Sequence, residues 1–194
     1  GNYLRLFADL IRNRKLIFIL LITGGYAAAA NSITTFLPVY IREDLGHSSL
    51  VLGSYLTLAQ VIGIGSQPLM GYLSDLFGRK AIIFPSLLGM GLTILGLYFV
   101  PPGIPFMLVL AATGAFMFSI MAMLLAAASD LVGKEVQGTA SSLVYGAWAM
   151  FAGISPMVAG IIADTFGVKA VFLFASAIAL TISFVALVTP WHRR

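Results

Sequence analysis

The charged residues of this 194-residue chain lie in a few short segments, and long apolar stretches without any charge separate them. The charge-free stretches span residues 16–41, 45–74, 81–129, 136–163 and 170–192. A transmembrane helix needs about 20 consecutive apolar residues, whereas a transmembrane strand has about 10 residues of alternating polarity. Because the stretches are longer than such a strand and apolar on every side, they predict membrane-spanning helices.

The third stretch has room for two helices, and a cluster of helix breakers from Pro101 to Pro105 divides it. The sequence therefore predicts an all-α membrane protein with six transmembrane helices, at 16–41, 48–72, 81–100, 105–129, 137–163 and 169–190. Hydrophobic residues make up 60% of the chain and charged residues 9%, and a soluble core of this size does not bury so much apolar surface. This composition excludes an ordinary soluble enzyme, a disordered chain and a nucleic-acid-binding module.

Basic residues are divided unequally between the two sides of this topology. One side carries Arg5, Arg12, Arg14, Lys15, Arg79, Lys80, Lys134, Arg193 and Arg194, and the other carries Arg42 and Lys169. The positive-inside rule then places the first side, with both termini, in the cytoplasm. We expect a multi-pass protein of the plasma (inner) membrane, with residues 1–15 as a cytoplasmic amphipathic linker and 16–194 as the transmembrane bundle. A cleaved signal peptide at the start is the alternative, but the apolar run continues to residue 41, beyond the length of such a peptide.

An eleven-residue segment occurs twice in the chain. The segment 71–81 reads GYLSDLFGRKA, and the segment 160–170, which lies 89 residues later, reads GIIADTFGVKA. The identical pairs are Gly71/Gly160, Asp75/Asp164, Phe77/Phe166, Gly78/Gly167, Lys80/Lys169 and Ala81/Ala170. Each segment joins the second and third helices of a set of three, but the two segments lie on opposite sides of the membrane. Because a repeat of opposite topology is typical of secondary transporters, the helices are predicted to form a three-plus-three inverted repeat.

The first copy of the repeat carries residues suited to a gate. Gly71 is expected to allow close helix approach, and Gly78 is expected to form a tight turn. Asp75 can cap a helix start or form an ion pair with Arg79 or Lys80. If these contacts break when the helices move, the loop acts as a conformational latch. The alternative is a structural turn whose charges only set the orientation.

The pattern Gly71-x-Leu73-x-Asp75-x-x-Gly78-Arg79-Lys80 resembles the signature loop of the major facilitator superfamily, with Leu76 where the family usually has Arg. The resemblance implies a parent of twelve helices in two six-helix halves, with the substrate between the halves. This chain then looks like one half. Its lead-in resembles the linker before the seventh helix, and 105–129 lacks the Arg usual in the fourth helix, which favours the C-terminal half.

The function that the resemblance implies is transport of a small solute by alternating access, with the lipid bilayer and the other six-helix half as partners. Two alternatives remain: a non-transporting scaffold or receptor of the same fold, and a six-helix chain that homodimerises into a carrier. No enzyme, metal, cofactor or nucleic-acid partner is expected, because the sequence shows no metal-ligand cluster or catalytic constellation. The absence of cysteine excludes disulfides and thiolate metal sites.

Uncharged polar residues near the middle of the predicted helices are candidates for binding a solute. Helical spacing places Asn31, Gln60 and Tyr145 on polar faces of the first, second and fifth helices. The resemblance implies that the first and fourth helices line the cavity, which adds Tyr26 and Phe116. The same residues can instead hold neighbouring helices together. The candidate solute-binding residues are Tyr26, Asn31, Gln60, Phe116, Tyr145 and Trp148.

Acidic and basic residues are missing from the interior of the predicted helices, since Lys169 lies at the first position of its helix. Buried charges within spans mark proton relays and ion pathways. If the transporter is coupled to protons, the proton carrier is therefore expected in the other half; the alternative is an uncoupled facilitator.

Overall fold

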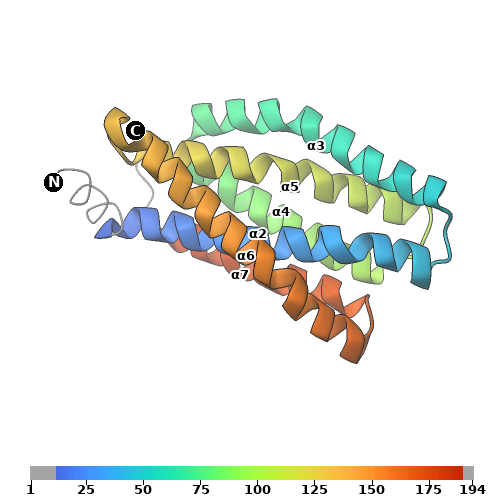
Figure 1. Cartoon of the computed structure of the whole chain (residues 1–194). Coiled ribbons are helices and arrows are strands. Elements are labelled where there is room, and N and C mark those ends of the chain that lie inside the picture. The colour runs from blue at the N-terminus through green and yellow to red at the C-terminus, as the bar shows by residue number, and fades with distance from the viewer. Residues whose placement is uncertain (1–11, 190–194) are drawn as a thin grey trace.

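The computed structural model describes residues 12–189, and within that range six long helices pack lengthwise into one bundle (Figure 1). The helices are α2 (Arg14–Val39), α3 (Ser49–Phe77), α4 (Arg79–Phe99), α5 (Ile104–Asp130), α6 (Gln137–Phe166) and α7 (Ala170–Val188). Each is long and apolar enough to cross a membrane, so the all-α prediction of six spans is confirmed. Of the predicted linker 1–15, only residues 12–15 are among the described residues, and Arg14 and Lys15 already belong to α2.

Capping groups explain where several helices begin. The Asn13 side-chain oxygen accepts hydrogen bonds from the backbone N–H groups of Lys15 and Leu16, at 3.1 and 3.4 Å, at the start of α2. The Ser48 hydroxyl accepts one from Val51 at the start of α3. These side chains satisfy N–H groups that have no partner within the helix. Short turns complete the chain: a π-helical turn, Tyr40–Asp44, extends α2, and a 3-10 turn, Lys134–Val136, precedes α6.

The connection between α3 and α4 is shorter than the sequence predicted. Helix α3 continues to Phe77 and α4 begins at Arg79, so that Gly78 alone lies between them, and the prediction that the two helices are separated by residues 73–80 is wrong. Gly78 has φ 94° and ψ 151°, a conformation that residues with a Cβ rarely adopt, which lets the chain reverse in one residue. Gly167 repeats this conformation between α6 and α7, with φ 89° and ψ 155°. The tight turn predicted at Gly78 is thus present in both copies of the repeat.

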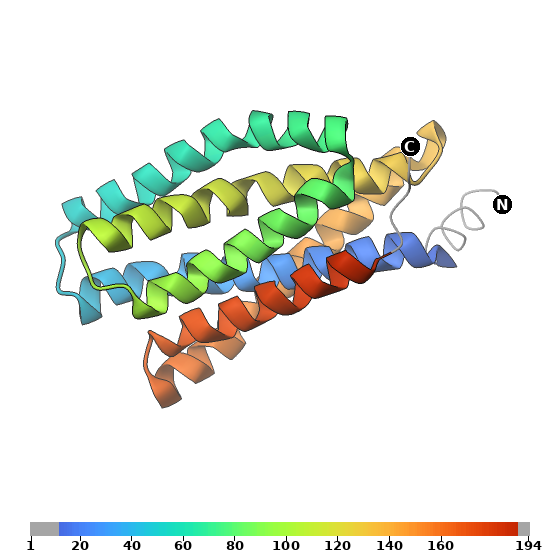
Figure 2. The ribbon, with the colours of Figure 1, turned by 180° about the vertical axis from the view of Figure 1, so that it is seen from behind.

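The packing of the helices has the symmetry of the sequence repeat. Helix α3 packs along α5 as α6 packs along α2, and α4 packs against α5 as α7 packs against α2. Exchanging the first three helices with the last three therefore reproduces the arrangement. The α3–α4 and α6–α7 turns lie at opposite ends of the bundle (Figures 1 and 2). Together these observations confirm the inverted three-plus-three repeat.

The two repeat-related helix contacts differ in their chemistry. Between α3 and α5, the Ser66 hydroxyl donates to the carbonyl of Ala115 at 2.7 Å, and Gln67 Nε2 donates to the carbonyl of Phe118 at 2.9 Å. Ser155, which is the repeat equivalent of Ser66, is buried on α6 and has no hydrogen-bond partner in the described part of the chain. Within residues 12–189, no hydrogen bond joins α6 to α2. Packing alone therefore holds this second contact.

Candidate functional site

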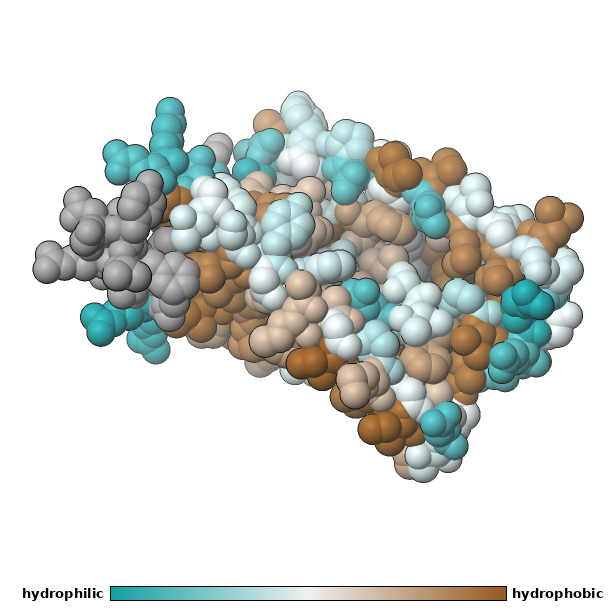
Figure 3. Space-filling view, viewed as in Figure 1, coloured by the Kyte–Doolittle hydropathy of each residue, from teal (hydrophilic) through white to brown (hydrophobic). Residues whose placement is uncertain are grey.

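The bundle has one face on which polar side chains gather between α3 and α6 (Figure 3). Helices α3 and α6 are the least buried of the six, whereas α4 and α7 lie on the opposite side (Figures 1 and 2). The polar residues of this face are exposed or half-buried and lie on α2, α3 and α6. We use the term open face for the surface formed by Asn31, Thr34, Thr57, Gln60, Gln67, Ser142 and Tyr145. This set is polar but carries no charge. The described charged residues lie near the helix ends or in the turns.

On α2, the polar side chains of the open face are bonded to their own helix. Asn31 Nδ2 donates to the carbonyl of Ala27 at 2.9 Å. The Thr34 hydroxyl lies 3.0 Å from the carbonyl of Ala30, and it can donate there. These bonds to the preceding turn use the Thr34 hydroxyl proton and one of the two N–H donors of Asn31, and they leave the second Asn31 N–H and the oxygens of both side chains available.

Two of the predicted solute-binding residues lie away from the open face. Tyr26 is buried, and its hydroxyl donates across to the carbonyl of Met117 on α5 at 2.9 Å, which ties α2 to α5. The Phe116 ring lies against Gly89 of α4, where an added Cβ would come within 2.8 Å of the ring. Both side chains therefore contact a neighbouring helix in this structure, and their role in binding a solute stays a prediction.

The other predicted residues lie on or beside the open face. Gln60 is exposed on α3, and the Tyr145 side chain on α6 is 54% exposed. Trp148, also on α6, is half-buried and packs against the core. Neither Gln60, Tyr145 nor Trp148 has a hydrogen-bond partner among residues 12–189, so their polar groups are available to a bound molecule. No group of His, Asp or Glu residues in this range is arranged to hold a metal ion.

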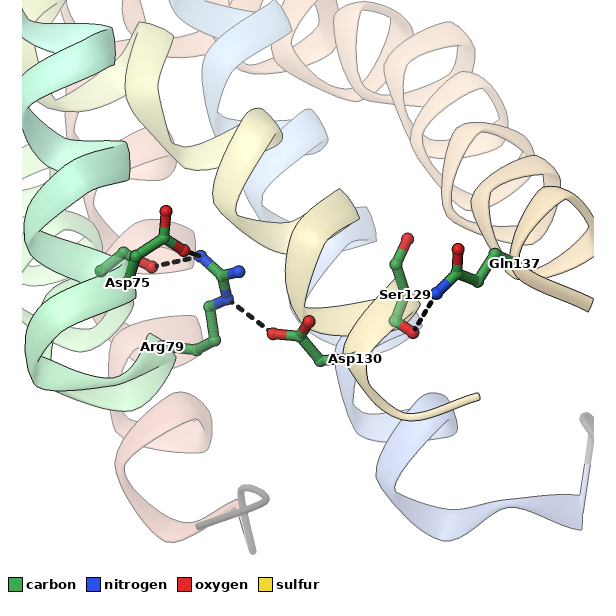
Figure 4. Close-up of polar contacts among 6 residues, drawn as sticks. Asp75, Arg79, Ser129, Asp130 and Gln137 are labelled. Carbon is green, nitrogen blue, oxygen red and sulfur yellow. Dashed lines mark hydrogen bonds and ion pairs between the residues drawn. The ribbon is translucent and has the colours of Figure 1, made fainter. Parts of the chain in front are cut away.

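A cluster of ion pairs lies at one end of the bundle, where α3, α4 and α5 meet (Figure 4). Arg79 Nη1 lies 2.7 Å from Asp75 Oδ1, and Arg79 Nε lies 2.9 Å from Asp130 Oδ2. Arg79 Nη1 also donates to Ser74 Oγ at 2.9 Å. One guanidinium group thus links the end of α3 to the end of α5, a geometry that the rigid fork of arginine donors favours.

The Asp75–Arg79 pair was predicted, but Asp130 was not. Two features of the sequence could have indicated Asp130. It is the first charged residue after the 81–129 stretch, and the topology places it at the same end of the bundle as Arg79. Lys80 makes no ion pair in the described part of the chain. Among residues 12–189, nothing lies within 4 Å of a Cβ placed on Gly71, so close helix approach at this residue stays a prediction.

Comparison with known proteins decides the family. The model of the Major Facilitator Superfamily matches residues 17–194. The chain belongs to the major facilitator superfamily. It is 30% identical over 168 residues to the "Multi-drug resistance efflux pump PmrA" of Streptococcus pneumoniae. The aligned region covers 81% of this chain and 41% of that relative. It is 27% identical over 169 residues to the "Multidrug resistance protein MdtG" of Escherichia coli. The aligned region covers 82% of this chain and 40% of that relative.

The chain spans about two fifths of the length of these curated relatives. Its six spans make it a half-size major facilitator domain, as the six predicted helices and the family resemblance implied. Membership of this superfamily confirms that the chain is a multi-pass membrane protein of the transporter class.

Proposed function

We propose that this chain is the C-terminal six-helix half of a major facilitator efflux transporter, which carries small organic solutes by alternating access. The observation that carries the proposal is the open face, a neutral polar surface along α2, α3 and α6, in a chain similar to part of two multidrug efflux proteins. Transporters of this kind bind solute near the membrane midplane between two halves. Asn31, Gln60, Tyr145 and Trp148 are the proposed solute-facing residues.

The proposed partner of the open face is the other six-helix half. Helices α3 and α6 expose large apolar side chains along most of their lengths, among them Ile64, Leu69, Met150 and Met157. Lipid covers part of this surface, but the polar groups between the two helices have no partner in hydrocarbon. A second half would enclose these groups in a cavity that water and solute enter.

The proposed latch is the cluster of Asp75, Arg79 and Asp130. Its ion pairs bridge three helix ends, and a motion that separates the α3–α4 turn from the end of α5 breaks the pair of Arg79 with Asp130. Asp75 is 59% exposed, and exposed ion pairs contribute only about 0.2–1 kcal/mol. A contact of this strength biases one conformation without locking it, which suits a latch that opens in each cycle.

The test is dye transport by the full-length protein in proteoliposomes, with a panel that includes a cationic, a neutral and an anionic fluorescent dye. We expect export of at least one dye, slowed by Asp75→Asn and by Asp130→Asn at equal membrane insertion. The matched control is Asp164→Asn, because Asp164 is the repeat equivalent of Asp75 and forms no ion pair within residues 12–189. Failure to move any dye would favour a scaffold or receptor. Transport by the six-helix chain alone would favour a homodimeric carrier.

A further inference from the structure

We propose that the cytoplasmic end of the contact between α4 and α7 binds an anionic phospholipid, whose phosphate group pairs with Lys80. The inference goes beyond the proposed function and does not depend on it, because α4 and α7 lie on the side of the bundle away from the open face (Figure 2). It follows from a difference between the two copies of the sequence repeat, whose lysines do not have the same surroundings.

Lys169, in the second copy of the repeat, has a partner across the contact between α4 and α7. Its Nζ lies 5.0 Å from the centre of the Tyr98 ring, near the end of α4. An ammonium group over an aromatic ring is attracted to the negative face of that ring. The charge of Lys169 is therefore stabilised within the protein.

Lys80, the repeat equivalent of Lys169, lacks such a partner. The residue that corresponds to Tyr98 is Leu187, which lies 89 positions later on α7 and offers no aromatic ring. Lys80 is half-buried, and in the described part of the chain its side chain makes no ion pair or hydrogen bond and lies over no ring. Its ammonium group is therefore available to a ligand.

Lys80 lies on the side of α4 that packs against α7. Gly91 of α4 contacts Leu180 of α7, since a Cβ on Gly91 would come within 2.8 Å of that side chain. Lys80 precedes Gly91 by eleven residues, which is about three helical turns, so the two residues share one side of α4. The beginning of α4 and the end of α7 lie at the same end of the bundle (Figure 2). The exposed apolar residues at this end of α7 are Phe184, Leu187 and Val188.

The helices that flank this surface carry no acidic residue. Within their bounds, α2, α4 and α7 contain no Asp or Glu. The acids where α3, α4 and α5 meet, Asp75 and Asp130, pair with Arg79 instead. Helical spacing turns Lys80 about 100° away from Arg79 around α4. An anion that approaches Lys80 along α7 therefore meets no carboxylate on these three helices.

A phospholipid fits this surface better than a soluble anion does. The excess of basic residues predicts that this end of the helices lies at the cytoplasmic leaflet, where anionic lipids gather. Basic sites between transmembrane helices on this side bind phospholipid headgroups. Lys80 offers a point charge to the phosphate, and the apolar end of α7 offers contact to an acyl chain. Arg14 and Lys15, at the beginning of the neighbouring α2, add positive charge at the same end, which favours an anionic over a zwitterionic lipid.

The experiment labels the full-length protein in detergent micelles with a phosphatidylglycerol that carries a photoactivatable diazirine near the head of one acyl chain. Labelled peptides are identified by mass spectrometry, so that the readout is local and does not depend on transport. We expect labelling at the end of α7, over residues 184–188. Unlabelled phosphatidylglycerol should displace the probe about five-fold more effectively than phosphatidylcholine does, the effect of one basic residue near an anionic headgroup.

Variants separate Lys80 from the general positive charge of the cytoplasmic side. Lys80→Gln should remove the preference for phosphatidylglycerol, and Lys80→Arg should keep it. The matched control is Lys134→Gln, which removes one charge from the same side of the membrane in an exposed turn and should leave the preference unchanged. Leu187→Tyr keeps every charge but gives Lys80 the kind of partner that Lys169 has, so it should lower the preference.

A preference that survives Lys80→Gln or Leu187→Tyr, an equal loss in Lys134→Gln, or the absence of labelling at the end of α7 would overturn the inference. The headgroup without acyl chains, glycerophosphoglycerol, should not displace the probe. If it competes as effectively as the whole lipid, a soluble phosphate ester is the ligand and the assignment to a phospholipid is wrong.

Discussion

Replacing Gly114 with alanine tests whether direct backbone contact sets the distance between α3 and α5. A Cβ at this position would lie 2.8 Å from the carbonyl carbon and 3.0 Å from the Cα of Ala59, and nearer still to the Ala59 carbonyl oxygen. Carbon atoms in contact prefer about 3.5–4.0 Å, so α3 must withdraw by about 1 Å. The bonds of Ser66 and Gln67 to α5, now 2.7 and 2.9 Å long, would then exceed hydrogen-bond length.

The expected loss of stability follows from three contributions. Overpacking costs about 1–3 kcal/mol, and each lost hydrogen bond between membrane helices costs about 0.6 kcal/mol. Alanine is a better helix former than glycine by about 1 kcal/mol, which offsets part of the loss. The Gly114→Ala variant should therefore unfold with a free energy lower by about 1–3 kcal/mol.

The measurement is reversible unfolding of the full-length protein in mixed lipid–detergent micelles, followed by circular dichroism. The matched control is Gly65→Ala on α3, where nothing lies within 4 Å of the new Cβ, and which should be as stable as the wild type or slightly more so. If Gly114→Ala unfolds at the same denaturant concentration as Gly65→Ala, backbone contact does not set the α3–α5 distance and the reasoning fails.

Other predictions follow from the repeat and the ion-pair cluster. Ser66→Ala should lower the free energy of unfolding by about 0.6–1.7 kcal/mol, whereas Ser155→Ala at the equivalent position should not lower it, and equal losses in the same unfolding assay would contradict this difference. Gly78→Ala and Gly167→Ala should each lose about 1–3 kcal/mol, because both residues have a positive φ, and a loss confined to one of them would show that the turns are not equivalent. Arg79→Lys should slow dye export in proteoliposomes, because lysine lacks the planar fork that contacts both Asp75 and Asp130, and an unchanged rate would argue against the latch.

The sequence was most informative where membrane physics restricts it. Charges within the hydrocarbon region are expensive, so the gaps between charged segments located all six helices to within a few residues. The paired motifs predicted the inverted repeat because Gly78 and Gly167 occupy a backbone conformation that excludes most other residues.

Long-range placement was harder to predict. The pairing of Asp130 with Arg79 depends on how α5 packs beside the end of α3, and no spacing along the chain encodes that contact. Tyr26 and Phe116 carry side chains that suit either a cavity or a helix contact. Tyr26 bonds to the Met117 carbonyl, 91 residues later in the chain, and the Phe116 ring lies against Gly89 on α4. No spacing along the sequence encodes either contact.

The contrast between the two repeat-related contacts makes the bundle stiff on one side and compliant on the other. Sliding α3 along α5 would break the hydrogen bonds of Ser66 and Gln67. Sliding α6 along α2 would break none among the described residues, and Ser32 and Ser155 are already buried there without partners. Shear within this half therefore requires less free energy at the contact of α6 with α2 than at the contact of α3 with α5.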